Sequence, residues 1–146
     1  MTPADLERVI EIARSLKEAP QWALSAYVAA LNPEGSPRRI ALVAENAETG
    51  VVLGFAVASL VGSQAELETM AVAAEGQRRG VGRRLFAAMV EEMRLAAIGE
   101  VALEARASNL PARGFYRVLG FAEMGRRPRY YAEPEEDAVL MGLRLA

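Results

Sequence analysis

The segment that decides the fold spans residues 71–85 and reads Ala71-Val72-Ala73-Ala74-Glu75-Gly76-Gln77-Arg78-Arg79-Gly80-Val81-Gly82-Arg83-Arg84-Leu85. The pattern predicts the end of a strand, a short glycine-rich turn and the start of a helix. Gly80 and Gly82 allow the backbone to turn tightly and to present its N–H groups. The first turn of a helix adds N–H groups without partners and the positive end of the helix dipole. The segment therefore predicts an anion site, and we expect the anion to be a pyrophosphate.

Four arginines occur within seven residues of this segment, at positions 78, 79, 83 and 84. Their guanidinium groups offer forked donors to phosphate oxygens. Cations are unfavourable at a helix N-terminus, which argues against the alternative of a basic helix start that binds nothing. The dinucleotide fingerprint is excluded because Leu85 stands where a small residue is needed, and no Gly-Lys-Ser/Thr sequence marks a P-loop.

Composition limits the chemistry that is available. The 146 residues predict a single domain over residues 1–146, and a net charge of −2 gives no sign of nucleic-acid binding. The chain has no cysteine and no histidine, so thiol catalysis, disulfides and imidazole bases are excluded. Acid–base chemistry must come from carboxylates, tyrosine, lysine or water. We see no cluster of carboxylates that predicts a metal site.

The sequence also gives no sign of a membrane segment. The longest apolar run, about residues 51–61, is too short to cross a bilayer and predicts a buried strand. Asp5 and Glu7 stand where a signal peptide would carry positive charge. The cytoplasm is therefore the default location.

Hydrophobic periodicity predicts helices and strands in mixed order. Helices are expected over residues 2–16, 22–31, 81 to about 97, and 109–119; strands over 39–44, 51–60, 65–72, 100–107, 121–125 and 138–145; and a basic, then acidic loop over 126–137. The strand–helix–strand unit around 65–107 implies parallel pairing, and the hairpins imply antiparallel pairing. We expect an α/β fold with a mixed, mostly antiparallel sheet and helices on both faces.

Two finer expectations concern which side chains face inward. In the helix over 22–31, the expected inner face is Trp22, Ala26 (or Leu24) and Tyr27. In the strand over 65–72, the period of two places four side chains on one face, namely Glu66, Glu68, Met70 and Val72.

Three segments together resemble the GNAT superfamily of acetyl-CoA-dependent N-acetyltransferases. Residues 77–82 resemble its Gln/Arg-x-x-Gly-x-Gly/Ala motif, residues 109–121 its Tyr-x-x-x-Gly-Phe segment, and residues 67–72 the strand beside the cofactor. Residues 103–109, with Tyr130-Tyr131 and 136–141, resemble the RimI-like ribosomal-protein-alanine N-acetyltransferase subfamily. The superfamily usually opens with a strand before its first helix, but Met1-Thr2-Pro3 leaves no room for one. The first strand is therefore expected to be short or missing.

The resemblance implies where acetyl-CoA binds. The pyrophosphate is expected on the backbone of six consecutive residues, with Gln77 adjacent: Arg78, Arg79, Gly80, Val81, Gly82 and Arg83. The pantetheine arm is expected to pair with the backbone of Met70, Ala71 and Val72, and the N–H of Val72 to polarise the thioester carbonyl. Asn109 is expected to bond the pantetheine, to cap its helix, or to do both.

The resemblance also implies the catalytic groups. Glu104 is the candidate base, and the alternative is a solvent-facing glutamate or an ion pair with Arg106. Glu68 is the rival base. Tyr116 is the candidate acid that protonates the leaving thiolate, and its alternative is an aromatic residue packed in the core beside Phe115.

The acceptor is expected to be an amine, possibly the N-terminus of a ribosomal protein. Roughly a tenth of an α-amine is neutral at pH 7, against well under one in a thousand for lysine, which favours the α-amine. The alternatives are a small-molecule amine, a lysine side chain, or a CoA-binding sensor without turnover. Tyr130 and Tyr131, expected on a mobile loop, could clamp a peptide or pack at the loop base. No metal, nucleic acid or membrane partner is expected, and the chain is a monomer or homodimer.

Overall fold

The structure is a computed structural model that describes residues 1–145, so the expected domain end at residue 146 lies outside the described residues. One six-stranded sheet forms the centre. Its strands are β1 (Arg38–Glu45), β2 (Val52–Val61), β3 (Gln64–Val72), β4 (Glu100–Arg106), β5 (Ala122–Ala132) and β6 (Glu135–Arg144). The helices are α1 (Leu6–Ser15), α2 (Leu24–Ala30), α3 (Val81–Leu95) and α4 (Leu110–Val118), with 3-10 turns η1 (Pro3–Asp5) and η2 (Ala74–Gly76).

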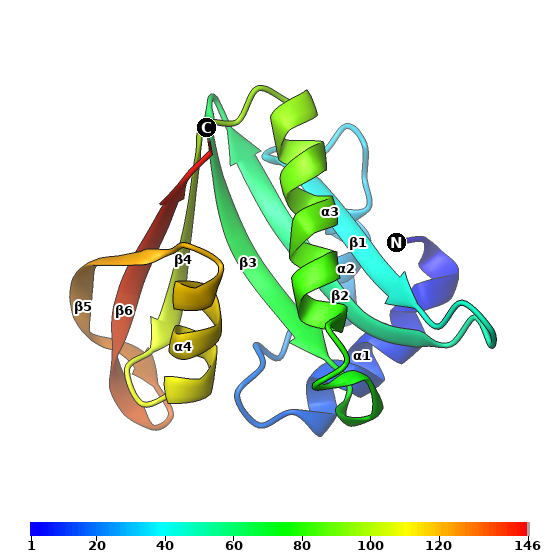
Figure 1. The fold of residues 1–146 in the computed structure, drawn as a ribbon, viewed down its shortest axis with the longest axis horizontal. Helices are drawn as coiled ribbons and strands as arrows, with labels where there is room; N and C mark the ends of the chain where they lie inside the picture. The colour runs from blue at the N-terminus through cyan, green and yellow to red at the C-terminus, as the bar shows by residue number, and fades with distance from the viewer. Residues whose placement is uncertain (146) are drawn as a thin grey trace.

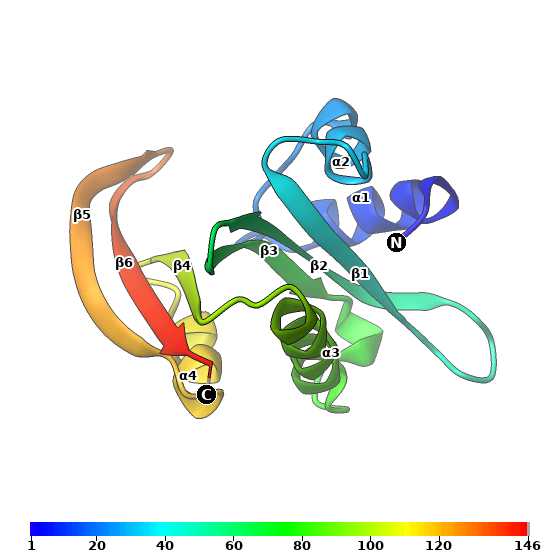
Figure 2. The ribbon, with the colours of Figure 1, turned by 90° about the horizontal axis from the view of Figure 1, so that it is seen from above.

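The sheet is mixed, as the sequence predicts. The strand order is β1-β2-β3-β4-β6-β5, and β3 with β4 is its only parallel pair in the described chain. Helices α1 and α2 lie on one face, and α3 and α4 lie on the other (Figure 2). Residues 1 and 2 form no strand, and the first described element is the 3-10 turn η1.

The parallel pair holds the two halves of the sheet together over a very short length. Only Gln64, Ala65 and Glu66 of β3 have partners in β4, which are residues 100–102. Beyond these three pairs the strands diverge toward the end where α3 begins (Figure 1). The second half of β3 therefore keeps one backbone edge unpaired by a neighbouring strand.

A β-bulge at Glu68 changes which way β3 faces. Val57 of β2 lies opposite Thr69, and the next residue, Ala58, lies opposite Leu67. Leu67 and Met70 consequently pack into the same core cluster, although they are three positions apart. The expectation that Glu66, Glu68, Met70 and Val72 share one face is wrong, because the extra residue reverses the alternation.

The core consists of two clusters, one on each face of the sheet. The cluster under α3 contains Leu85, Met89, Met93, Val101 and Val139, among others. The cluster under α1 and α2 contains Leu6, Val9, Tyr27, Phe55 and Ala71, among others.

None of the helices in residues 1–145 is long and apolar enough to span a membrane.

The helix expected over 22–31 begins at Leu24, and its inner face is only partly as expected. Tyr27 is fully buried, whereas Ala26 and Leu24 are exposed. Ala30 is the second buried residue. A helix of seven residues buries only the narrow i, i+3 stripe that lies against its neighbours, and this stripe passes through 27 and 30.

The loop expected over 126–137 is a hairpin of two strands. β5 continues to Ala132 and β6 starts at Glu135, with breaks in register between Glu123 and Gly125 and between Arg127 and Tyr131. Nearly every residue of β5, one of the two edge strands, is exposed. It therefore lacks the hydrophobic alternation by which a strand is predicted.

Candidate active site

The segment before α3 presents a row of free backbone donors. Arg78 and Gly80 have positive φ angles, 62° and 76°, and Gly80 is the N-cap of α3. Within residues 1–145, the N–H groups of residues 78–83 donate no hydrogen bond. Successive N–H groups in such a turn form a concave anion site, and the helix dipole adds positive potential. The turn therefore has the backbone geometry that the predicted anion site requires.

Side-chain contacts attach the segment before α3 to the neighbouring strands and to α1. Gln77 Nε2 donates to the carbonyl oxygen of Val72 at 3.0 Å, which ties the turn to the end of β3. Arg8 of α1 binds both Glu75 and, at 3.1 Å, the carbonyl oxygen of Val52. The arginines at 78, 79, 83 and 84 are exposed and form no ion pair within the described residues. Their charge is therefore available to an anion.

Gly82 lies where three elements meet. A Cβ atom at this position would be 3.1 Å from the ring of Phe115 in α4 and 3.6 Å from the side chain of Val72 in β3. A side chain here would require the ring of Phe115 to shift. The second glycine of the motif is therefore favoured by close packing, whereas Gly80 is favoured by its positive φ.

The unpaired edge of β3 leads directly to this turn. The N–H of Ala73 donates to the carbonyl oxygen of Leu53 in β2 at 2.8 Å. Because backbone groups alternate along a strand, Ala71 also faces β2, while Met70 and Val72 direct theirs into the gap between β3 and β4. Two of the three residues expected to face the cofactor are thus available, and Ala71 is not.

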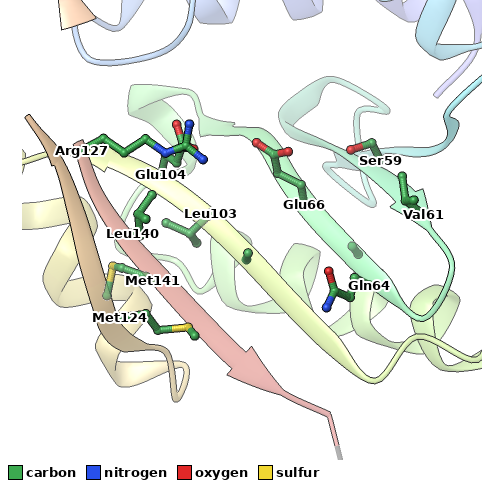
Figure 3. A pocket seen from close by; sticks show the side chains of 12 residues that line it. Ser59, Val61, Gln64, Glu66, Leu103, Glu104, Met124, Arg127, Leu140 and Met141 are labelled. Atoms are coloured by element: carbon green, nitrogen blue, oxygen red, sulfur yellow. The ribbon is translucent and has the colours of Figure 1, made fainter. Parts of the chain in front are cut away.

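The opposite face of the sheet carries a pocket of about 390 Å³ at the β3–β4 junction. Its polar lining includes Ser59, Gln64, Glu66, Glu104 and Arg127. Glu66 and Glu104 project to the same side of their strands, and Arg127 reaches over from β5 (Figure 3). The pocket therefore combines an apolar floor with a charged rim.

Glu104 is largely buried, with 19% of its side chain exposed, and lies 3.5 Å from Arg127 Nε. The alternative pairing of Glu104 with Arg106 is wrong, because Arg106 contacts Glu136 instead. The rival, Glu68, is 18% exposed and pairs with Arg39 at 2.8 Å. Both candidate bases are thus shielded carboxylates held by an arginine.

Glu66 was not among the predicted site residues. Burial, followed by the charges of Glu104 and Glu68, raises the pKa of the Glu66 carboxyl, and Arg127 opposes this. The three carboxylates are therefore close enough to influence one another. The bulge turns Met70 away from this group, and the sequence does not mark the bulge.

Tyr116 lies on the other face of the sheet, in α4. Its ring packs edge-on against Phe115 and Phe121, with centroids 5.5 Å apart in both cases. Burial raises the pKa of Tyr116 to about 12. The hydroxyl has no hydrogen-bond partner within residues 1–145. The ring thus belongs to the core, as the alternative expected, while the hydroxyl remains free to act.

Asn109 caps α4, because its side chain accepts a hydrogen bond from the N–H of Ala112 at 3.2 Å. Its amide NH₂ makes no bond to the described residues and remains available.

The tandem tyrosines lie on the β5–β6 hairpin and not on the expected loop. Tyr130 is half exposed and its ring lies 5.6 Å from the guanidinium of Arg127. Hydrogen bonding to Glu104, and then the charge of that carboxylate, raises the pKa of the Tyr130 phenol. Tyr131 is more buried, beneath the guanidinium of Arg106 at 4.3 Å. Tyr130 therefore faces the carboxylates, and Tyr131 packs against Arg106.

Comparison with known proteins agrees with this arrangement. Residues 6–121 match the Acetyltransferase (GNAT) family. The chain belongs to this family. It is 35% identical over 101 residues to ribosomal protein bS18-alanine N-acetyltransferase of Escherichia coli, a match that covers 68% of each chain.

A relative in Bacillus subtilis, named as a putative enzyme of the same kind, is 31% identical over 137 residues and covers 94% of this chain and 87% of its own. A crystal structure of the ribosomal-protein-alanine N-acetyltransferase from Escherichia coli superposes with a TM-score of 0.84 at 27% identity, over 100% of this chain and 91% of that one. The chain is therefore an N-acetyltransferase, and enzymes of this family take the acetyl group from acetyl-CoA. In residues 1–145, no group of three acidic side chains could hold a metal ion.

The contact between Arg8 and Glu75 generates a prediction about acid stability. Hydrogen bonding to Arg8 lowers the pKa of the Glu75 carboxyl from its usual value of 4.5. A lowered native pKa gives stability that is present above the unfolded pKa and lost as the pH falls through the native pKa. Glu75→Gln should therefore flatten the loss of stability below about pH 4.5, as measured by urea unfolding from pH 7 to pH 3.

The matched control is Glu48→Gln, in the β1–β2 turn, where the glutamate forms no ion pair within residues 1–145. It should leave the acid limb as in the wild type. If Glu75→Gln retained that limb unchanged, the pairing would not hold in solution.

Proposed function

We propose that this enzyme transfers the acetyl group of acetyl-CoA to the N-terminal α-amine of a protein. The observation that carries the proposal is the split between β3 and β4, which has free backbone donors toward α3 and shielded carboxylates on the opposite face. Donor and acceptor could thus approach one gap from opposite sides. The relatives named for ribosomal protein bS18 support a protein N-terminus as the acceptor class.

The backbone of residues 78–83 would hold the pyrophosphate of acetyl-CoA, and the exposed arginines of the same segment would neutralise its charge. The exposed edge at Met70 and Val72 would pair with the amide groups of the pantetheine arm. Acetyl-CoA supplies a thioester as the activated acyl donor. The N–H of Val72 lies on the edge where it could stabilise negative charge on the carbonyl oxygen.

Glu104 would act as the general base on the acceptor. It has the shielded position that a base requires, and its contact with Arg127 would orient the carboxylate. The proton would pass from the acceptor ammonium to Glu104 through water, which leaves a neutral amine to attack. Glu66 and Glu68 add negative potential that attracts a cationic amine to the pocket.

Tyr116 would return a proton to the thiolate that leaves. With a pKa of about 12, its phenol remains protonated throughout the working range of pH. The coenzyme thiolate is a poor leaving group without a proton, so a donor beside it accelerates departure. Packing of the ring against Phe115 and Phe121 would fix the direction in which the hydroxyl is offered.

Two alternative functions would give different results in an acetylation assay. An enzyme for lysine or for a small amine would use the same donor site but a different acceptor. A CoA-binding sensor would bind without turnover, although a binder needs neither a shielded carboxylate nor a free phenol.

An acetylation screen tests the proposal. Purified protein is incubated with acetyl-CoA and with N-terminal peptides, lysine peptides whose α-amine is blocked, and small amines, and products are read by mass spectrometry. We expect acetylation of free N-termini, and a loss of about 10²–10⁴-fold in Glu104→Gln. Acetylation of only the blocked lysine peptides or small amines would replace the acceptor class. No product from any acceptor would favour the sensor.

The anion site predicts a specific loss of donor binding. Arg79→Glu combined with Gly82→Asp should abolish acetyl-CoA binding in calorimetry, because it adds negative charge and bulk beside the free N–H groups. Arg94→Glu makes the same arginine-to-glutamate change at the other end of α3, away from the anion site, and should bind as the wild type does. Unchanged affinity in the double variant would remove the anion-site assignment.

The proton donor predicts an effect on turnover without an effect on binding. Tyr116→Phe keeps the packed ring, so we expect turnover to fall about 10²-fold while the Kd for acetyl-CoA stays near the wild-type value. Phe115→Leu is the control for packing in the same turn and should not reproduce this separation. Full turnover in Tyr116→Phe would make Tyr116 a residue of the core alone.

A further inference from the structure

The hydrogen-bond ladder of the β5–β6 hairpin is interrupted before its last two pairs, Tyr131 with Glu136 and Ala132 with Glu135. Arg127 pairs with Ala138 and the next pair is Tyr131 with Glu136, so residues 128–130 have no partner in β6. Arg129, in the middle of this break, has a φ of 53°. Its N–H donates to Asp137 Oδ1 at 3.0 Å, which is a side-chain contact and not a rung of the ladder. Tyr130, which lies in this break, therefore depends on contacts outside the ladder for its place over the pocket.

Arg106, the last residue of β4, provides that support. Its guanidinium donates to the carbonyl oxygen of Pro134 at 3.0 Å and to that of Glu133 at 3.2 Å. The same group lies 4.3 Å above the ring of Tyr131 and 3.8 Å from the carboxylate of Glu136. A planar guanidinium can bond two carbonyls and cover a ring at once, which an ammonium cannot do.

The base of this support is rigid. β4 pairs with β6 without a break from Glu100 opposite Arg144 to Arg106 opposite Ala138. Arg106 therefore extends from the last rung of a continuous ladder to the turn beyond it. Glu136 also accepts hydrogen bonds from the N–H and the hydroxyl of Ser108, at 3.3 and 3.0 Å, and so joins the hairpin to the segment that begins α4.

A continuous set of contacts runs from Arg106 to the candidate base. Tyr131 contacts Tyr130 edge-on at 5.1 Å, and Tyr130 lies against both Arg127 and Glu104. Glu104 and Arg106 are two positions apart in β4 and share one face of the strand. The series of contacts therefore starts at Arg106 and ends at Glu104, two side chains on the same face of β4, and it passes through the tyrosines of the hairpin.

We propose that Arg106 is a positioning residue for the acceptor side of the reaction. It fixes the end of the hairpin so that Tyr130, which stacks with Arg127, is held against Glu104. Arg106 does not touch the anion site or the free edge of β3, so its loss acts on acceptor binding and leaves acetyl-CoA binding unchanged. This role rests on the proposed function for its kinetic consequence, but its structural consequence is independent of any substrate.

The structural consequence is tested by NMR of the full chain with ¹³C-labelled tyrosine, since the sequence has only four tyrosines. Arg106→Gln removes the cation above Tyr131 and one of the two carbonyl contacts. The signals of Tyr130 and Tyr131 should move, while those of Tyr27 and Tyr116, packed in other parts of the fold, should not. Tyrosine spectra identical to the wild type would overturn the proposal even if the enzyme acetylated no peptide.

The kinetic consequence is measured with the acceptor that the wild type acetylates. Arg106→Gln should raise the KM for this acceptor about tenfold and leave the Kd for acetyl-CoA unchanged. Arg106→Lys, which keeps the charge but not the fork, should recover part of the loss. Arg144→Gln, which removes an 87% exposed arginine from the opposite end of β6, should behave as the wild type.

A double-mutant cycle separates positioning from general destabilisation. If Arg106 acts through Tyr131, then Tyr131→Leu and the double variant Arg106→Gln/Tyr131→Leu should raise the acceptor KM to the same extent. Additive effects, or equal losses of acetyl-CoA and acceptor binding, would contradict the proposal. Failure of the proposed function would look different: the wild-type protein would acetylate no N-terminal peptide, while Arg106→Gln would still show the expected shifts of the Tyr130 and Tyr131 signals.

Discussion

The proposed active site depends on one feature of the sheet: β3 and β4 stop pairing after three residue pairs. Those pairs keep the two halves of the sheet in register, and the core cluster under α3 packs against both halves. Past Glu66, the backbone groups of β3 that would have bonded β4 have no strand beside them. Buried backbone groups are rarely left without partners, so an exposed edge of this kind is a place where a ligand can complete the sheet.

The bulge at Glu68 makes this edge useful on both faces. Before the bulge, the apolar side chain of Leu67 points toward α3; after it, Met70 and Val72 do so. The glutamates of the same strand therefore lie on the proposed acceptor side, and the residues next to the anion-binding turn lie on the proposed donor side. One inserted residue thus places the glutamates of β3 on one face and Met70 and Val72 on the other. Bulges are often found at functional sites.

Local signals made much of the donor side predictable from the sequence. A glycine that needs a positive φ, a helix start and a cluster of arginines depend only on neighbouring residues, and the structure reproduces them at Gly80 and residues 78–84. The order of strands and helices follows from hydrophobic periodicity in the same way. The polar cap at Asn109 is likewise a local feature.

The acceptor side was less predictable because it depends on contacts between distant segments. Period-two alternation fails at Glu68, since the bulge is set by the packing of β2 against β3. The strand containing Tyr130 was missed because an exposed edge strand has no apolar alternation. The ion pair of Glu104 with Arg127 joins β4 to β5 and could not be distinguished from a pair with Arg106 by sequence spacing alone.

Amide hydrogen exchange with and without acetyl-CoA measures the central claim most directly. If the split sheet exposes a donor site, acetyl-CoA should slow exchange at the amides of Met70, Val72 and residues 78–83. The amides of β2, already bonded within the sheet, should exchange as before. Protection that appears elsewhere in the chain and not at these positions would contradict the account.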